Sequence, residues 1–92
     1  MAASSRSVPQ SEQRDLVNRL RRIEGQIGGV IAMIEDGRDC TEIITQIAAS
    51  KKAIERAGIL MLTGALERCM ADQKRTSGAR RTELQKAFLS LT

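Results

Sequence analysis

The hydrophobic residues of this chain recur at spacings of three and four, the period of an amphipathic helix. The first such stripe consists of Leu16, Leu20, Ile23, Ile27, Val30, Ile31 and Ile34. It predicts a helix over about residues 12–35, with Ser11 as its N-cap. Asp36 and Gly37 predict its end, because glycine readily adopts the left-handed conformation that closes a helix.

A second and longer stripe follows. It consists of Ile43, Ile44, Ile47, Ile54, Ala57, Leu60, Met61, Leu62, Ala65, Leu66 and Cys69. It predicts a helix from Cys40 to about residue 73, with Asp39 and Glu42 at the spacing of a capping box. No proline interrupts this helix, which would be about 50 Å long. The shorter first helix cannot cover it, so the exposed part of the stripe requires another subunit.

The C-terminal part predicts a third, short helix. Polar residues 74–78 predict a break, and Leu84, Phe88 and Leu91 follow at helical spacing. The fold class is therefore all-α, with three helices per chain, one of them long and central. Residues 12–92 form one domain, and residues 1–11 form a disordered polar arm.

Composition supports association between chains. The 92 residues include one Phe and no Trp or Tyr, so a monomeric core would lack the largest apolar side chains. No run of apolar residues is long enough to span a membrane. The N-terminus lacks the apolar core of a secretory signal. We expect a cytoplasmic protein, in which thiols stay reduced.

The only two cysteines lie near opposite ends of the predicted long helix. Cys40 and Cys69 are 29 residues apart, about 43 Å along a continuous helix. A disulfide requires Cα atoms about 4.4–6.8 Å apart, so the two cannot meet within one chain. Antiparallel pairing of two long helices would place Cys40 of one chain against Cys69 of the other, with the dyad near Ile54 and Glu55. The alternative is that both are ordinary small buried residues, which suits Cys69 better than Cys40.

Positive charge is concentrated in three clusters, and the formal net charge is +4. The clusters are Arg14, Arg19, Arg21 and Arg22; Lys51, Lys52 and Arg56; and Lys74, Arg75, Arg80 and Arg81. Any one of them is typical of a solvated face. Together, on a small oligomer, they favour a nucleic-acid partner. No helix-turn-helix, zinc-finger or ribbon signature accompanies them.

The sequence argues against an enzyme and against a resident metal or cofactor. It has no histidine, no glycine-rich phosphate loop and no nucleophile elbow. A structural zinc site needs about four ligands, which two cysteines do not provide.

The strongest clue is a segment that resembles the CsoR/RcnR/FrmR family of transcriptional repressors. It reads LVNRLRRIEGQIGGVIAMIEDGRDCTEIITQIAASKKAIERAG, in which RLRRIEGQ, the DC pair and QIAA are the most specific parts. The resemblance implies an antiparallel dimer forming a four-helix bundle, assembled as a homotetramer (a dimer of dimers) on double-stranded operator DNA. It also implies that Arg19 and Arg56 bind DNA. Their clusters add Arg14, Arg21, Arg22 and Lys52 as candidate DNA contacts.

Comparison with the family's copper sensors indicates what the cysteines do. Those sensors use a cysteine that opens the second helix, together with a histidine and a cysteine four residues apart on the partner chain. Cys40 and Cys69 match the two cysteines, but Ala65 occupies the histidine position. The remaining dithiol looks like that of the CstR-type branch, which senses persulfides.

This resemblance implies a thiol switch rather than a metal site. One thiolate would attack the sulfane sulfur of a persulfide or polysulfide, and the second would close a di- or polysulfide bridge that releases DNA. Which cysteine attacks first stays open. The alternatives are a Cu(I)-responsive repressor with a reduced ligand set, and a sulfur-carrying or structural helical oligomer that does not bind DNA.

Overall fold

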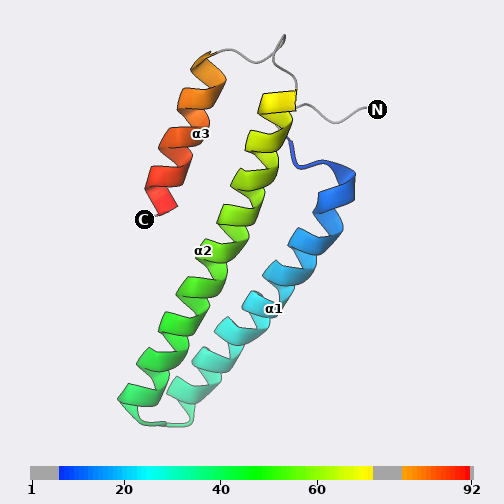
Figure 1. Cartoon of the computed structure of the whole chain (residues 1–92). Helices are drawn as coiled ribbons and strands as arrows, with labels where there is room; N and C mark the ends of the chain where they lie inside the picture. The colour runs from blue at the N-terminus through cyan, green and yellow to red at the C-terminus, as the bar shows by residue number, and fades with distance from the viewer. Residues whose placement is uncertain (1–6, 72–77, 92) are drawn as a thin grey trace.

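The computed structural model describes residues 7–71 and 78–91, which form three helices: α1 (Gln10–Glu35), α2 (Cys40–Ala71) and α3 (Gly78–Leu91). No strand occurs in these two segments. Helix α2 is central, with α1 along one side and α3 along the other (Figure 1). The prediction of an all-α fold with one long central helix is confirmed.

Helix α1 begins at Gln10, two residues earlier than predicted. Pro9, not Ser11, is its N-cap, and the Pro9 carbonyl accepts the backbone N–H groups of Glu12 and Gln13, both at 3.0 Å. The prediction of Ser11 was wrong because proline, with φ fixed at −62° here, already directs the chain into the helix. Residues 1–6 of the predicted arm lie outside the described residues.

Helix α1 ends as predicted at Asp36 and Gly37. Gly37 has φ of 70°, a conformation that residues with a Cβ rarely adopt. The Arg38 N–H donates to the Met33 carbonyl at 3.0 Å, and the Gly37 N–H donates to the Ile34 carbonyl at 3.1 Å. These two bonds are those of a Schellman motif. They close α1 and turn the chain tightly into α2.

Helix α2 is one continuous helix of 32 residues, about 48 Å long. It begins at Cys40 as predicted. Its predicted extension to residue 73 and the predicted break over residues 74–77 lie outside the described residues, and Gly78 already belongs to α3. Neither α2 nor the other two helices described has the combination of length and apolarity needed to cross a membrane.

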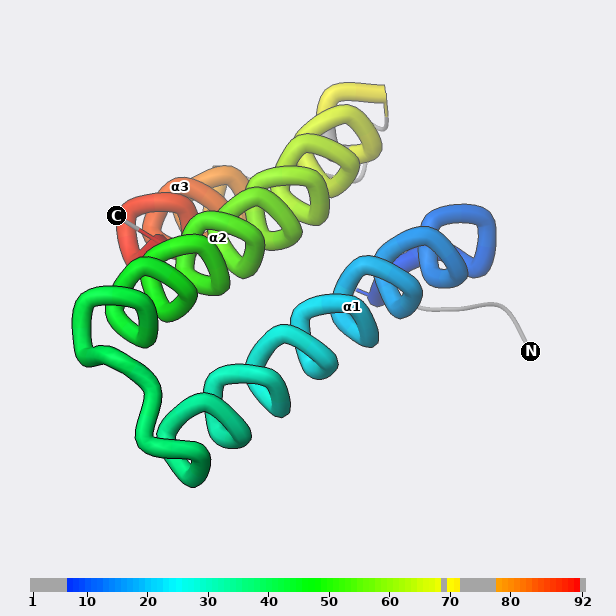
Figure 2. Tube along the Cα trace, turned by 90° about the horizontal axis from the view of Figure 1, so that it is seen from below, coloured from blue at the N-terminus to red at the C-terminus, as the bar shows by residue number. Residues whose placement is uncertain are grey.

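The three helices form a single thin layer. Both α1 and α3 pack on α2 and, in the part of the chain that the structure describes, not on each other. Figure 2 shows them on either side of α2. The molecule measures 56 × 28 × 14 Å, so its smallest dimension is about that of one helix with its side chains. Its radius of gyration of 17.0 Å exceeds the ~12 Å typical of a compact chain of this length.

A layer this thin has very little interior. The buried residues among those described are Ile23, Ala57, Leu84 and Ser50. The Ser50 hydroxyl donates to the Gln46 carbonyl at 3.0 Å, which satisfies it inside the helix. Most of the predicted apolar stripe is exposed, including Leu20, Ile27, Ile31, Ile34, Ile44, Ile47, Ile54, Leu60, Met61 and Leu66. Stable domains bury such stripes between at least two layers, so this surface is typical of one that another chain covers.

Candidate functional site

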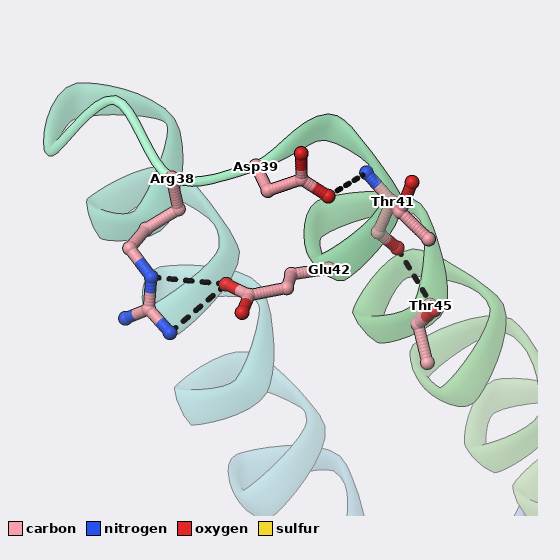
Figure 3. Close-up of polar contacts among 5 residues, drawn as sticks. All are labelled: Arg38, Asp39, Thr41, Glu42 and Thr45. Carbon is pink, nitrogen blue, oxygen red and sulfur yellow. Dashed lines mark hydrogen bonds and ion pairs between the residues drawn. The ribbon is translucent and has the colours of Figure 1, made fainter.

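The first predicted thiol lies at the start of α2. Cys40 is exposed and free, and it is the first residue of the helix. Asp39 caps the helix there, since its carboxylate accepts the backbone N–H of Thr41 at 3.0 Å (Figure 3). This cap fixes where α2 starts and therefore where Cys40 lies.

The predicted capping box itself does not form, since the Asp39 carboxylate accepts the N–H of Thr41 and not that of Glu42. The Glu42 carboxylate turns to Arg38, whose Nε and Nη2 approach the same Glu42 oxygen at 3.0 and 2.9 Å (Figure 3). A guanidinium four residues away gives this carboxylate a charged partner, which competes with the backbone N–H that a capping box would use. Because both side chains are largely exposed, the pair contributes at most ~1 kcal/mol to stability. The pair flanks Cys40 in the sequence, with one member two residues away on each side.

The second predicted thiol belongs to the last turn of the same helix. Because α2 is unbroken, Cys40 and Cys69 are separated by about 43 Å along its axis. The structure therefore confirms that the two residues stand at opposite ends of one helix and does not bring them together. Among the described side chains, no group of three or more cysteines and carboxylates is close enough to hold a metal ion.

The predicted DNA contacts are surface residues of α1 and α2. Arg14, Arg19, Arg21, Arg22, Lys52 and Arg56 are all exposed. Lys52 and Arg56 share a face of α2, because residues four apart in a helix lie above one another. The Nζ atom of the neighbouring Lys51 lies 3.9 Å from Glu55 Oε1. In the third cluster, Lys74 and Arg75 lie outside the described residues. The exposed positions of the basic residues on α1 and α2 suit contact with DNA, which stays a prediction.

The sequence did not reveal an ion pair that joins the two long helices near Cys69. Arg68 of α2 donates to the carboxylate of Glu12 in the first turn of α1. Gly64, one turn earlier in α2, leaves the space that the Glu12 carboxylate occupies. Opposite charges and a helical glycine were visible in the sequence, but no local spacing links residues 56 positions apart.

Comparison with known proteins decides the family. Residues 12–90 match the model of a family described as metal-sensitive transcriptional repressors. The chain belongs to this family. The copper-sensing repressor CsoR of Bacillus subtilis is 38% identical to it over 61 residues, which cover 66% of this chain and 60% of CsoR. The copper-sensing repressor RicR of Mycobacterium tuberculosis is 36% identical over 61 residues, covering 65% of this chain and 64% of RicR.

The fold is that of the same repressor family. The solved structure of the nickel-responsive transcriptional regulator InrS superposes with a TM-score of 0.74 at 31% identity, and each chain is covered completely. Against CsoR and RicR, by contrast, the match spans less than two thirds of the relative's length. The three relatives are regulators of transcription and not enzymes, which agrees with the sequence prediction. Their names refer to copper or nickel, so the predicted persulfide branch stays a prediction.

Proposed function

We propose that this member of the metal-sensitive repressor family is a DNA-binding repressor whose inducer is reactive sulfur. In this proposal, Cys40 of one chain and Cys69 of its partner form the switch. The observation that carries it is the pair of thiols at opposite ends of one continuous helix, in a chain without histidine. Two such chains paired antiparallel would bring the thiol of Cys40 from one and that of Cys69 from the other together as two sulfur nucleophiles. Ala65 provides no imidazole beside Cys69.

The switch requires an antiparallel dimer. When Cys40 of each chain faces Cys69 of the other, the dyad passes near Ile54 and Glu55. Ile54 is 45% exposed and Ile47, two turns earlier on the same side, is 50% exposed. They line a largely apolar cavity of about 500 Å³ together with Ile27 and Val30 of α1. A second copy would fill this cavity and add the missing layer, giving a four-helix bundle.

A groove between α2 and α3 supports the further association of two dimers into a homotetramer. This groove has a volume of about 590 Å³. Its apolar lining includes Ile59, Leu66, Met70 and Phe88. All four side chains are exposed in the single chain. Covering them would bury a second apolar surface without using the face that forms the dimer.

The chemistry needs only the two thiols and a persulfide, RSSH. The first thiolate attacks the terminal sulfur, a Cys–S–SH group forms, and RS⁻ leaves. The second thiolate then attacks the cysteine sulfur of that group, the S–S bond breaks, and HS⁻ leaves. Overall, two thiols are oxidised to a disulfide and RSSH is reduced to RSH and H₂S. A polysulfide donor would give a longer bridge by the same displacement.

Bridging both ends of the dimer would favour one arrangement of the two long helices. Arg56 lies on α2 itself, and Arg19 lies on α1, which packs against α2. A covalent bridge that favours a geometry with poor spacing of these residues lowers the population of the DNA-binding form.

Mass spectrometry combined with an operator-binding assay tests the proposed release of DNA on bridging. Treatment with sodium tetrasulfide is expected to produce an intersubunit Cys40–Cys69 bridge with zero to several extra sulfurs, together with loss of operator affinity. Unchanged affinity after complete bridging would contradict the proposal.

Cu(I) induction is the second candidate, and the copper-sensing relatives favour it. Two thiolates suit Cu(I), which is a soft ion. The chain contains no histidine, so it lacks the imidazole ligand that the resemblance to copper sensors implies. In the same assay, release of DNA by Cu(I) but not by tetrasulfide would establish this candidate in place of the first.

The DNA-binding surface is tested by removing single charges. Arg19→Ala and Arg56→Ala are each expected to weaken operator binding by about tenfold to a hundredfold, since one charge-assisted contact to phosphate contributes ~1.5–3 kcal/mol. Each should also reduce the slope of log affinity against log salt concentration by about 1 or more. Fluorescence anisotropy at several salt concentrations measures both effects.

Lys86→Ala is the matched control for these substitutions. It removes the same charge from an exposed position of α3 outside the three clusters. We expect little change in its operator affinity. If all three variants and the original protein show no salt-dependent operator binding, the chain is a helical oligomer that does not bind DNA.

A further inference from the structure

The Glu12–Arg68 ion pair joins the start of α1 to the end of α2. Arg68 Nη1 donates to Glu12 Oε2, across 56 positions of sequence. The two side chains are 33% and 37% exposed, so the pair is partly shielded from water. The interaction energy of a shielded pair is larger than that of the exposed pairs within single helices, because its charges are less well screened by water and salt.

The surroundings fit this pair closely. A Cβ at Gly64 would overlap the Glu12 carboxylate and lie 3.2 Å from Arg68 Nη1. Arg68 Nε is buried without a hydrogen-bond partner among the described atoms. Glu12 therefore provides the neutralising contact for a guanidinium that is only partly solvated. Loss of Glu12 would leave that positive charge without its neutralising partner.

The pair lies between two features of the proposed function. Arg68 is the direct neighbour of Cys69 in the last turn of α2. Glu12 is in the first turn of α1, two residues before Arg14 and two turns before Arg19. The ion pair therefore gives the last turn of α2 a direct contact with the start of α1, close in sequence to these arginines.

We propose that Glu12 and Arg68, accommodated by Gly64, are positioning residues that couple the state of Cys69 to the arginines of α1. This inference rests on the proposed function. When Cys69 is bonded to Cys40 of the partner subunit, the last turn of α2 follows the new bond and carries Arg68 with it. The ion pair then shifts the start of α1. By thermodynamic reciprocity, DNA held by α1 would disfavour bridging to the same extent.

Three substitutions that break the pair have different effects on net charge. Glu12→Gln raises the net charge by one and Arg68→Gln lowers it by one. Gly64→Ala leaves the net charge unchanged, while its methyl group displaces the Glu12 carboxylate. A purely electrostatic effect on DNA binding would have opposite signs in the first two and be absent from the third. Coupling predicts that all three respond alike. Gly64→Ala also improves helix propensity, so it keeps α2 folded.

The measured quantity is the ratio of operator affinity between the reduced and the bridged protein. We expect each variant to lower this ratio by about 5-fold or more, the lower end of typical coupling between sites. The Glu12→Gln/Arg68→Gln double variant should lower it no further than either single variant. Lys86→Gln is the control, because it removes one positive charge from an exposed position of α3 outside the three basic clusters. Its ratio should equal that of the unsubstituted protein. Unchanged ratios in Glu12→Gln and Gly64→Ala would overturn the inference.

A second readout does not depend on DNA. Hydrogen exchange of the α1 amides over residues 13–19 is compared between the reduced protein and protein bridged by diamide, an oxidant that needs no persulfide. Bridging should change this exchange in the unsubstituted protein and in Lys86→Gln, but not in Glu12→Gln or Gly64→Ala. The same response in all of them, or none in the unsubstituted protein, would contradict coupling. If α1 responds but DNA is not released, the proposed function fails and the coupling stands.

Discussion

Cys40→Ser and Cys69→Ser proteins should each fail to form a covalent dimer with tetrasulfide, and a mixture of the two should form one. Each variant lacks one partner of every Cys40–Cys69 pair. In a mixed antiparallel dimer, the Cys69→Ser chain supplies Cys40 and the Cys40→Ser chain supplies Cys69, which restores one of the two pairs. Pairing within a chain could not be restored in this way, and the ~43 Å along α2 excludes it.

The measurement is a non-reducing gel after the two variants have been unfolded together and refolded. Random assortment places roughly half of the dimers in the mixed form, and only these can become covalent. The operator affinity of each single variant should be unaffected by tetrasulfide. A covalent dimer from either variant alone, or none from the mixture, would contradict the antiparallel Cys40–Cys69 pairing.

Ile54→Asp should abolish both the dimer and most of the helical structure. Ile54 lies near the proposed dyad, so the substitution places two carboxylates opposite each other in an apolar interface. The lost burial amounts to ~1.5–3 kcal/mol per isoleucine, and the facing charges add to it. A chain whose buried apolar residues, among those described, are Ile23, Ala57 and Leu84 has little to hold it together alone. Analytical ultracentrifugation and far-ultraviolet circular dichroism would measure the two effects.

Two controls separate the apolar contact from charge. Lys52→Asp changes the charge by more, but at an exposed position of the basic face, and should leave the dimer intact. Ile54→Leu keeps the apolar surface and should behave like the unsubstituted protein, apart from small packing losses. A dimeric, fully helical Ile54→Asp protein would place the interface elsewhere.

The parts of the fold that were predictable from the sequence depend on nearest-neighbour chemistry. Gly37 ends α1 because its own backbone adopts a positive φ, and Asp39 starts α2 by capping the N–H of Thr41. Both interactions span a few residues, so the residue types alone were sufficient. The separation of Cys40 and Cys69 followed from the absence of a helix breaker between them.

The remaining features depend on competition or on distant residues. Pro9 replaced Ser11 as the N-cap because the fixed φ of proline already starts the helix. Glu42 turned to Arg38 because the guanidinium competes with the backbone N–H for its carboxylate. The Glu12–Arg68 contact depends on how α1 lies against α2, which periodicity does not specify. In the proposed function, the choice of inducer depends on atoms of two chains at once. A relative 31% identical shares the fold. In the proposed function, by contrast, the single residue Ala65 decides that no imidazole lies beside Cys69.

The 14 Å thickness of the molecule also bears on how the protein reaches its native state. A chain that forms one layer gains little free energy by collapsing alone, so formation of the proposed dimer would combine folding and encounter with another chain in one bimolecular process. Its rate would then rise with the concentration of newly synthesised chains. At low expression most chains would remain unfolded and open to proteolysis. The amount of active repressor would therefore rise more steeply than its rate of synthesis.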